Sequence, residues 1–210
     1  MRFLTRTFLA MTGVLVATAM ASATPITITG AATGSLSTAT GNLTVAGDTL
    51  TLQLTNTSPY DARITALGFD LFAGDFLSSG PSSGLDGYLQ NSGSSVGSFV
   101  FSDGALGTVP QFAGHVLDFG WQTGSNFAGG FPNSGLSPFS TLTFIVSGSF
   151  FGLTEAQIAN MLFVRFQQVG DNGDDSDVGR GRVSEPVSLL LFGAGLAGVA
   201  LVRRRRAARQ

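Results

Sequence analysis

The side chains best suited to chemistry in this chain form a short acidic run near its C-terminal end. Residues 171–177 read Asp-Asn-Gly-Asp-Asp-Ser-Asp, with carboxylates at Asp171, Asp174, Asp175 and Asp177. Hard oxygen ligands at this density could bind Ca²⁺. The run matches an EF-hand loop only loosely, because its Gly is at the third position and no Glu follows at the required distance. The alternative is a solvated spacer whose like charges are screened by water and salt. We expect no resident cofactor, with calcium at these four residues as the exception.

A catalytic site is hard to assemble from the other side chains. The chain has one His, His115, and no Cys, which excludes two-His zinc motifs and thiol nucleophiles. Ser is so common in this chain that its proximity to His115 could not by itself identify a nucleophile. Asp118 and Glu155 could act as a glycosidase pair, but nothing in the sequence brings them together. Residues 193–198 match G-x-G-x-x-G without the βαβ unit that dinucleotide binding requires. We therefore predict that the protein is not an enzyme.

Charge is distributed unevenly over the 210 residues. There is no Lys, and seven of the 11 Arg lie in the two terminal segments. Residues 24–184 hold four Arg against eleven Asp and one Glu, which gives this body a net charge of −8. So few cations cannot release counterions from a phosphate backbone. Nucleic acid is therefore excluded as a partner.

The body has the pattern of short antiparallel strands. In residues 49–56 leucines alternate with polar residues, which is the period of a strand with one wet face. Similar runs, separated by turn residues, predict further strands at 26–29, 41–46, 63–71, 98–102, 115–121, 140–146 and 161–168. Thr154 could cap one short helix over 155–161. We predict a mainly β fold: a single antiparallel β-sandwich, jelly-roll or Ig/cohesin-like, with one short helix and a core filled by many of the 18 Phe.

The N-terminal segment has the features of a secretory signal. Arg2 and Arg6 precede an apolar stretch, and Ala21-Ser22-Ala23 fits a signal-peptidase site. We therefore predict a signal peptide over residues 1–23 that engages the Sec translocon. The mature chain would begin at Thr24.

The C-terminal segment has the features of a membrane span. Residues 187–202 are apolar on all sides and would be about 24 Å long as a helix, somewhat short for a bilayer. A basic end follows at Arg203, Arg204, Arg205 and Arg206. The positive-inside rule keeps these arginines cytoplasmic. We therefore expect a C-terminal transmembrane helix, with the body on the side of the membrane away from the cytoplasm.

These features divide the chain into four parts. The signal peptide covers residues 1–23, and the β-sandwich domain covers residues 24–169. An acidic Gly/Asp linker is predicted at 170–183, followed by a tail at 184–210. The tail opens with Ser184, Glu185 and Pro186, directly before the span and the arginine run.

The order of motif, span and basic end resembles the PEP-CTERM sorting signal of exosortase substrates in Gram-negative bacteria. In that family a Pro-Glu-Pro motif precedes the span, and Ser184 stands here in place of the first Pro. Pro186 keeps the backbone of Glu185 extended and out of the helix, so an enzyme could recognise Glu185 there. The resemblance implies an exosortase as partner, which cleaves near Glu185 and Pro186.

The resemblance also implies a destination. Such a protein is exported, held at the inner membrane by its tail, and then released or transferred to the cell surface or extracellular space. Many members of that family accompany exopolysaccharide production and biofilm formation. We therefore expect a non-enzymatic cell-surface or extracellular-matrix protein linked to exopolysaccharide. A carbohydrate-binding module that uses an open loop or sheet face is the first alternative, and a cell-envelope hydrolase is the second.

Overall fold

The computed structural model describes residues 23–71, 84–90, 98–148, 150 and 152–184. The strands in these ranges are β1 (Thr24–Gly30), β2 (Gly34–Ala46), β3 (Thr49–Asn56), β4 (Arg63–Phe69), β5 (Asp86–Gln90), β6 (Val100–Thr108), β7 (Val116–Gln122), β8 (Thr141–Ser147), β9 (Leu162–Val169) and β10 (Asp175–Val183). A 3-10 turn, η1 (Pro132–Ser134), precedes β8, and the short helix α1 (Glu155–Asn160) precedes β9. The predicted signal peptide and the predicted span at 187–202 lie outside the described ranges. Within those ranges, no helix has the length and apolar character needed to cross a bilayer.

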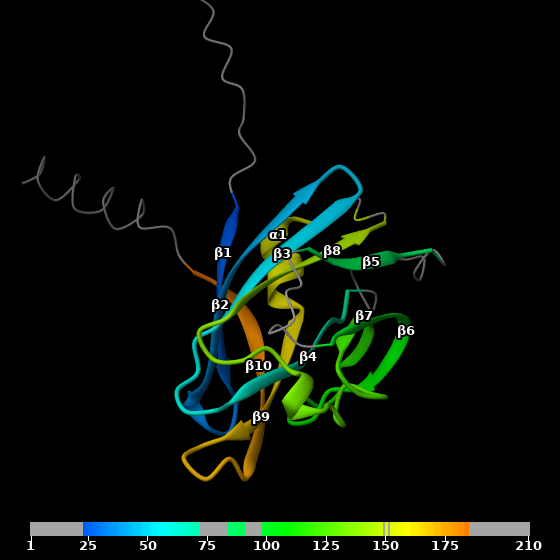
Figure 1. Cartoon of the computed structure of the whole chain (residues 1–210). Coiled ribbons are helices and arrows are strands. Elements are labelled where there is room, and N and C mark those ends of the chain that lie inside the picture. The colour runs from blue at the N-terminus through cyan, green and yellow to red at the C-terminus, as the bar shows by residue number, and fades with distance from the viewer. Residues whose placement is uncertain (1–22, 72–83, 91–97, 149, 151, 185–210) are drawn as a thin grey trace, which may run out of the picture.

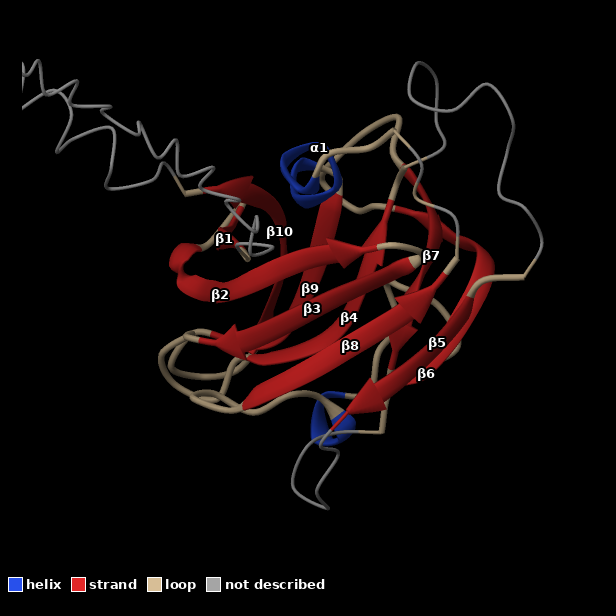
Figure 2. Ribbon diagram, turned by 90° about the horizontal axis from the view of Figure 1, so that it is seen from above, coloured by secondary structure: helices blue, strands red, loops and turns tan. Residues whose placement is uncertain are grey.

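All the described strands belong to one antiparallel sheet in the order β5-β8-β3-β2-β1-β10-β9-β4-β7-β6. Because β1 and β10 lie in the middle of this order, the sheet folds into two facing halves around them (Figure 1). Figure 2 shows β3 and β8 in front of β9 and β4. The two edge strands, β5 and β6, come into contact and nearly close the sheet. The prediction of a mainly β, antiparallel fold with one short α-helix is confirmed, and both layers come from one continuous sheet.

The main core lies between the two halves. Leu50, Leu52 and Leu54 of β3 alternate with polar residues and are fully buried, as their period of two predicts. Phe144 of β8 meets Trp121 of β7 with 5.2 Å between ring centroids, which joins one half to the other. The prediction that Phe fills the core is confirmed for Phe69, Phe99, Phe119, Phe127, Phe144, Phe150, Phe163 and Phe166.

The predicted helix cap is also confirmed. The Thr154 hydroxyl accepts a hydrogen bond from the Gln157 backbone N–H, and the Gln157 side chain accepts one from the Thr154 backbone N–H. This reciprocal pair is a capping box, which satisfies two N–H groups at the start of α1. The helix packs Ile158 and Ala159 into the core.

The predicted linker at 170–183 is wrong for residues 175–183. These residues form β10, which pairs with β1 on one side and β9 on the other. The strand was missed because Gly179 and Gly181 interrupt any apolar period and resemble spacer residues. Their small size is needed in the fold: a Cβ at Gly179 would meet the Ile28 side chain at 2.4 Å, and one at Gly181 would meet the Ala159 carbonyl oxygen at 2.2 Å.

Candidate polar binding face

The outward side of β1, β2, β3 and β8 carries a regular polar array. The register pairs Thr27 with Thr40, Thr40 with Thr55, and Thr55 with Thr141. Four threonines therefore lie in one row across four neighbouring strands. Asn42 and Gln53 pair in the adjacent row. We call this surface the threonine face, made of Thr27, Thr40, Asn42, Gln53, Thr55 and Thr141.

The composition of the threonine face follows from where it lies. β-branched Thr suits a pleated strand, and its hydroxyl suits an exposed side. In β1 and β3, buried residues therefore alternate with more exposed polar ones, as in Thr27-Ile28-Thr29 of β1. No position of the face carries a formal charge. The result is a neutral surface rich in hydroxyl and amide groups, each able to donate and accept hydrogen bonds.

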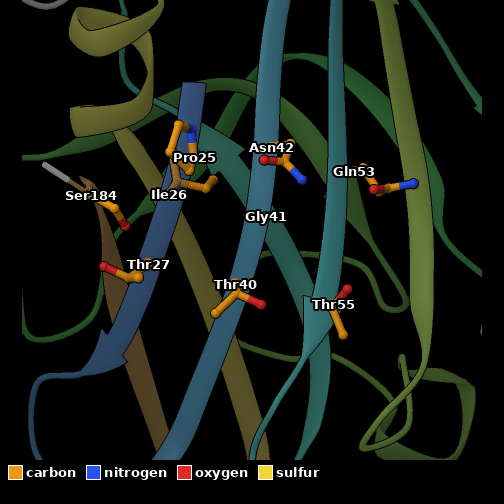
Figure 3. A pocket seen from close by; sticks show the side chains of 9 residues that line it. All are labelled: Pro25, Ile26, Thr27, Thr40, Gly41, Asn42, Gln53, Thr55 and Ser184. Atoms are coloured by element: carbon orange, nitrogen blue, oxygen red, sulfur yellow. The ribbon is translucent and has the colours of Figure 1, made fainter. Parts of the chain in front are cut away.

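A shallow hollow of about 280 Å³ lies on this face. Figure 3 shows the side chains of Thr40, Asn42, Gln53 and Thr55 around it, on two adjacent strands. Pro25 and Ser184 border it from the side of β1 and β10. We call it the threonine hollow. Its volume is slightly below the range usual for small-molecule pockets, so it fits a small unit such as one part of a longer chain.

A second hollow of about 550 Å³ adjoins the first, because Thr27 lines both. We call it the arginine hollow. Its lining includes Thr29 beside Thr27, the ring of Phe112, and the side chains of Arg180 and Arg182 from β10. Arg182 is opposite Thr27 in the register, and Arg180 is opposite Thr29. The two arginines therefore extend the threonine rows by one strand.

Arg180 is held in a defined position. Its Nε donates a hydrogen bond to the Asn160 carbonyl oxygen, and its Nη2 lies 3.4 Å from the Met161 sulfur. Its guanidinium carbon is 5.6 Å from the centre of the Phe163 ring, a cation–π distance. Arg182, by contrast, is exposed. One cation of the hollow is therefore oriented in advance, while the other is free to adjust.

A second hydrophobic cluster fixes Phe112 at the rim of the arginine hollow. Phe163, Val178 and Leu117 belong to this buried cluster, together with Leu106, Val109 and Phe127. Phe112 packs on this cluster, with its ring centroid 5.2 Å from that of Phe163. Phe112, in the segment between β6 and β7, therefore places an apolar side chain beside the two arginines.

The four body arginines have different surroundings. Arg63 lies 3.7 Å from Asp61 and donates to the Ser137 hydroxyl. Arg165 donates to the Ser176 hydroxyl; burial lowers its pKa, while the nearby charge of Asp177 opposes that shift. Within the described ranges, neither arginine of the hollow has a carboxylate at ion-pair distance, and no acidic side chain lines the hollow. The hollow is therefore a local positive site on an acidic domain.

The structure does not bring the four proposed calcium residues together. Asp171 and Asp174 are exposed in the connection between β9 and β10, Asp175 is exposed at the start of β10, and Asp177 is fully buried. The Asp177 carboxylate points to the turn between β1 and β2, where protein donors occupy it. Among the described residues, no group of three His, Asp or Glu side chains is placed to hold a metal ion.

Asp177 instead anchors the turn between β1 and β2. Its carboxylate accepts hydrogen bonds from the backbone N–H groups of Ala32 and Thr33 and from the hydroxyls of Thr33 and Ser37, at 2.6 to 3.2 Å. Burial raises the pKa of Asp177, but these hydrogen bonds outweigh it, so the pKa lies below its ordinary value. The charged form is therefore the stable one in the fold.

The other candidate acid–base residues have structural partners. Nδ1 of His115 lies 2.6 Å from Oδ2 of the buried Asp70, and its ring packs on Phe163 at 4.8 Å. Asp118 accepts a hydrogen bond from the Leu71 backbone N–H. Glu155 accepts from the Thr24 hydroxyl and the Val45 backbone N–H. None of the three lines either hollow.

Of the predicted sorting residues, only Ser184 lies within the described ranges. Its backbone N–H donates to the Pro25 carbonyl oxygen at 3.0 Å. The remaining predicted sorting residues lie outside those ranges, namely Glu185, Pro186, Arg203, Arg204, Arg205 and Arg206.

Sequence reasoning missed both hollows. The available signal was the repeated Thr-x-Thr spacing in β1, β2 and β8 and the Arg-x-Arg spacing of Arg180 and Arg182, each of which puts two side chains on one side of a strand. Comparison with protein-family models, with curated proteins and with solved structures finds no match to this chain.

Proposed function

We propose that this chain is an exported, non-enzymatic cell-surface or extracellular-matrix protein whose C-terminal tail is a sorting signal. The observation that carries the proposal is where the first and last described strands begin and end. β1 begins at Thr24, directly after the proposed cleavage site, and β10 ends at Val183, directly before the Ser184-Glu185-Pro186 motif. Removal of both terminal segments would therefore leave every described strand pairing in place.

The pairing of the first and last strands supports the same proposal. Ile26 of β1 is opposite Val183 of β10, so the two ends of the domain lie side by side in the middle of the sheet (Figure 1). A domain that ends at Ser184 would keep the pairing of its first and last strands. In the proposed route the Sec translocon exports the body, the span at 187–202 holds it at the inner membrane, and an exosortase then cuts near Glu185 and Pro186.

The proposal predicts processing at both ends. In cells with an active exosortase, intact-mass analysis should find a chain that begins at Thr24 and lacks the span and the arginine run. Replacing Glu185 with Gln and Pro186 with Ala should leave the tail attached and the protein in the membrane fraction. Ser184→Pro is the matched control, because it completes the Pro-Glu-Pro motif and should be cut at least as well. An intact tail on the unaltered chain in such cells would contradict the sorting role.

The finer description of the fold also belongs to this proposal. One half of the sheet has the order β3-β8-β5, and the other has the order β4-β7-β6. A pair of antiparallel chain segments wound around the core would give this order, which is the pattern of a jelly roll. β2, β1, β10 and β9 lie between these two groups. We favour a jelly-roll-like sandwich over an Ig- or cohesin-like one for this reason.

Carbohydrate binding is the second candidate function, and the threonine face favours it. Exposed hydroxyl and amide groups match the alternating donors and acceptors of a sugar chain, and two adjoining hollows give that chain a path. Sugar faces often stack on aromatic rings, but the exposed Tyr60, Tyr88, Phe131 and Phe139 line neither hollow. Phe112 is the aromatic side chain at this site. Hydrogen bonding would therefore contribute more to binding than stacking does.

A further inference from the structure

We infer that the arginine hollow binds carboxylate groups of an acidic polysaccharide whose neutral sugar hydroxyls lie along the threonine face. This inference rests on carbohydrate binding, the second of the functions proposed above, and names the class of glycan. Three features support it: the charge of the hollow, the free hydroxyls beside it, and the position of the Phe112 ring.

The charge of the hollow favours an anionic ligand. The body carries a net charge of −8, yet two of its four arginines line this hollow, and none of the described acidic residues lines it with them. A guanidinium presents paired N–H donors that fit the two oxygens of a carboxylate. Arg180 is already oriented by Asn160 and Phe163, so less side-chain freedom is lost when a ligand binds.

The row of threonines continues from the arginines in one direction. Neighbouring strands lie roughly 4.8 Å apart, so a polymer running across the strands meets one threonine per strand. The hydroxyls of Thr55 and Thr141 bond to each other at 2.7 Å. Thr27 and Thr40 are exposed, and no described residue accepts from or donates to their hydroxyls. Thr27 lies opposite Arg182 and Thr40 lies one strand further along the same row, so both hydroxyls are available to a sugar.

The Phe112 ring gives the hollow one apolar wall. Sugar rings have C–H groups on their faces as well as hydroxyls at their edges, so an apolar wall beside two cations suits a uronate unit better than a bare phosphate or sulfate. The adjoining threonine hollow accommodates the next unit of the same chain. A polymer that carries carboxylates on a polyhydroxylated backbone satisfies both hollows at once.

The test uses the full-length chain purified in detergent and two forms of one polymer. Polygalacturonate has the carboxylates, and its fully methyl-esterified form keeps the backbone without the charge. We expect the esterified polymer to bind about tenfold more weakly, or worse, because a charge-assisted pair is roughly twice as strong as a neutral hydrogen bond. Raising the salt concentration should weaken binding of the acidic form only.

Variants locate the binding site. Arg182→Gln should weaken polygalacturonate binding by roughly tenfold, and because Arg182 is exposed its loss should not disturb the fold. Arg63→Gln is the matched control: it removes the same charge outside the hollow and should leave binding unchanged. The double variant Thr27→Val/Thr40→Val keeps the side-chain shape and should weaken binding of both polymers.

Each other outcome overturns a distinct part of the inference. Equal binding of the two polymers would leave carbohydrate binding intact and remove the role of the carboxylate. Binding of neither polymer would remove the carbohydrate role itself, while the sorting proposal would still depend on its own mass analysis. An equal loss in Arg63→Gln and Arg182→Gln would show a general charge effect. Equally strong binding of free galacturonate or inorganic phosphate would show a small-anion site.

Discussion

Replacing Asp177 with Asn is expected to destabilise the domain by about 2–4 kcal/mol. The carboxylate is fully buried and accepts hydrogen bonds from the backbone N–H groups of Ala32 and Thr33 and from the Ser37 hydroxyl, so one substitution disturbs several hydrogen bonds. An amide supplies one oxygen in place of two and turns an N–H₂ group toward these donors. Urea denaturation of residues 24–184, followed by tryptophan fluorescence of the buried Trp121, measures the loss.

Asp171→Asn is the matched control for this prediction. It makes the same change of charge at an exposed position in the connection between β9 and β10, and should alter stability by less than about 0.5 kcal/mol. Equal stabilities of Asp177→Asn and the unaltered domain at neutral pH would show that the hydrogen bonds to Asp177 are not needed. Added calcium should not change the difference between the two proteins, because protein donors occupy the Asp177 carboxylate.

The pH dependence of stability tests the role of Asp177 independently. The folded domain holds the pKa of Asp177 below its ordinary value of about 3.9, so folding favours the charged carboxylate. The stabilisation is therefore fully present above that ordinary value and is lost as the pH falls through the lower pKa of the folded state. We expect the stability difference between the unaltered domain and Asp177→Asn to be constant from pH 5 to 7 and to shrink below about pH 4. A difference that grows on acidification would contradict this sign.

The elements predicted correctly from the sequence are those whose own residues carry the whole signal. In β3 the leucines alternate with polar residues, and the strand lies in the middle of one half with an exposed outer side. Helix α1 is marked by Thr154 and Gln157, three residues apart, which satisfy each other's backbone groups without help from the rest of the fold. Local chemistry was sufficient in both cases.

β10 could not be predicted from local chemistry, because its neighbours determine its residues. Gly179 lies where the Ile28 side chain approaches the strand, and Gly181 lies where the Ala159 carbonyl does. Asp177 is buried, and its carboxylate accepts hydrogen bonds from the turn between β1 and β2. Glycine and aspartate are typical of turns and spacers, so the segment resembles a linker when these partners are unknown. Two of these partners, Ile28 and Ala32, are more than a hundred residues away from β10 along the chain.

The candidate site shows the same limit. The sequence displays Thr-x-Thr and Arg-x-Arg spacings, which indicate sides of strands. It does not display the register that puts Thr27 beside both Thr40 and Arg182. That alignment depends on β10, so missing the strand meant missing the arginine hollow. The sorting tail is the opposite case: its signal is wholly local, and it stays a prediction because its residues beyond Ser184 lie outside the described ranges.

Replacing Gly87 with Val is expected to separate β5 from β6 and to destabilise the domain by about 1–3 kcal/mol. The ring of Phe101 from β6 lies directly over Gly87 of β5, and a Cβ at this glycine would meet three ring carbons at 2.2 to 2.6 Å. Phe101 in turn packs on Trp121 and Phe119, with centroid distances of 5.0 and 6.5 Å. Because Phe101 packs against both of these rings, we expect the edge strand to move. Urea denaturation measures the loss, and amide hydrogen exchange in β5 shows where it occurs.

The neighbouring residue and the ring itself provide the controls that make this prediction decisive. Tyr88→Val introduces the same side chain one position along β5, where the residue is exposed, and should change stability little. In isolation Phe101→Ala should also destabilise the domain, because it removes a ring that packs against the core. If Gly87→Val destabilises the domain through its clash with the Phe101 ring, the double variant Gly87→Val/Phe101→Ala should be more stable than the sum of the two single losses predicts. Strict additivity, or a domain stabilised by Gly87→Val through strand propensity alone, would mean that β5 and β6 do not meet through Phe101.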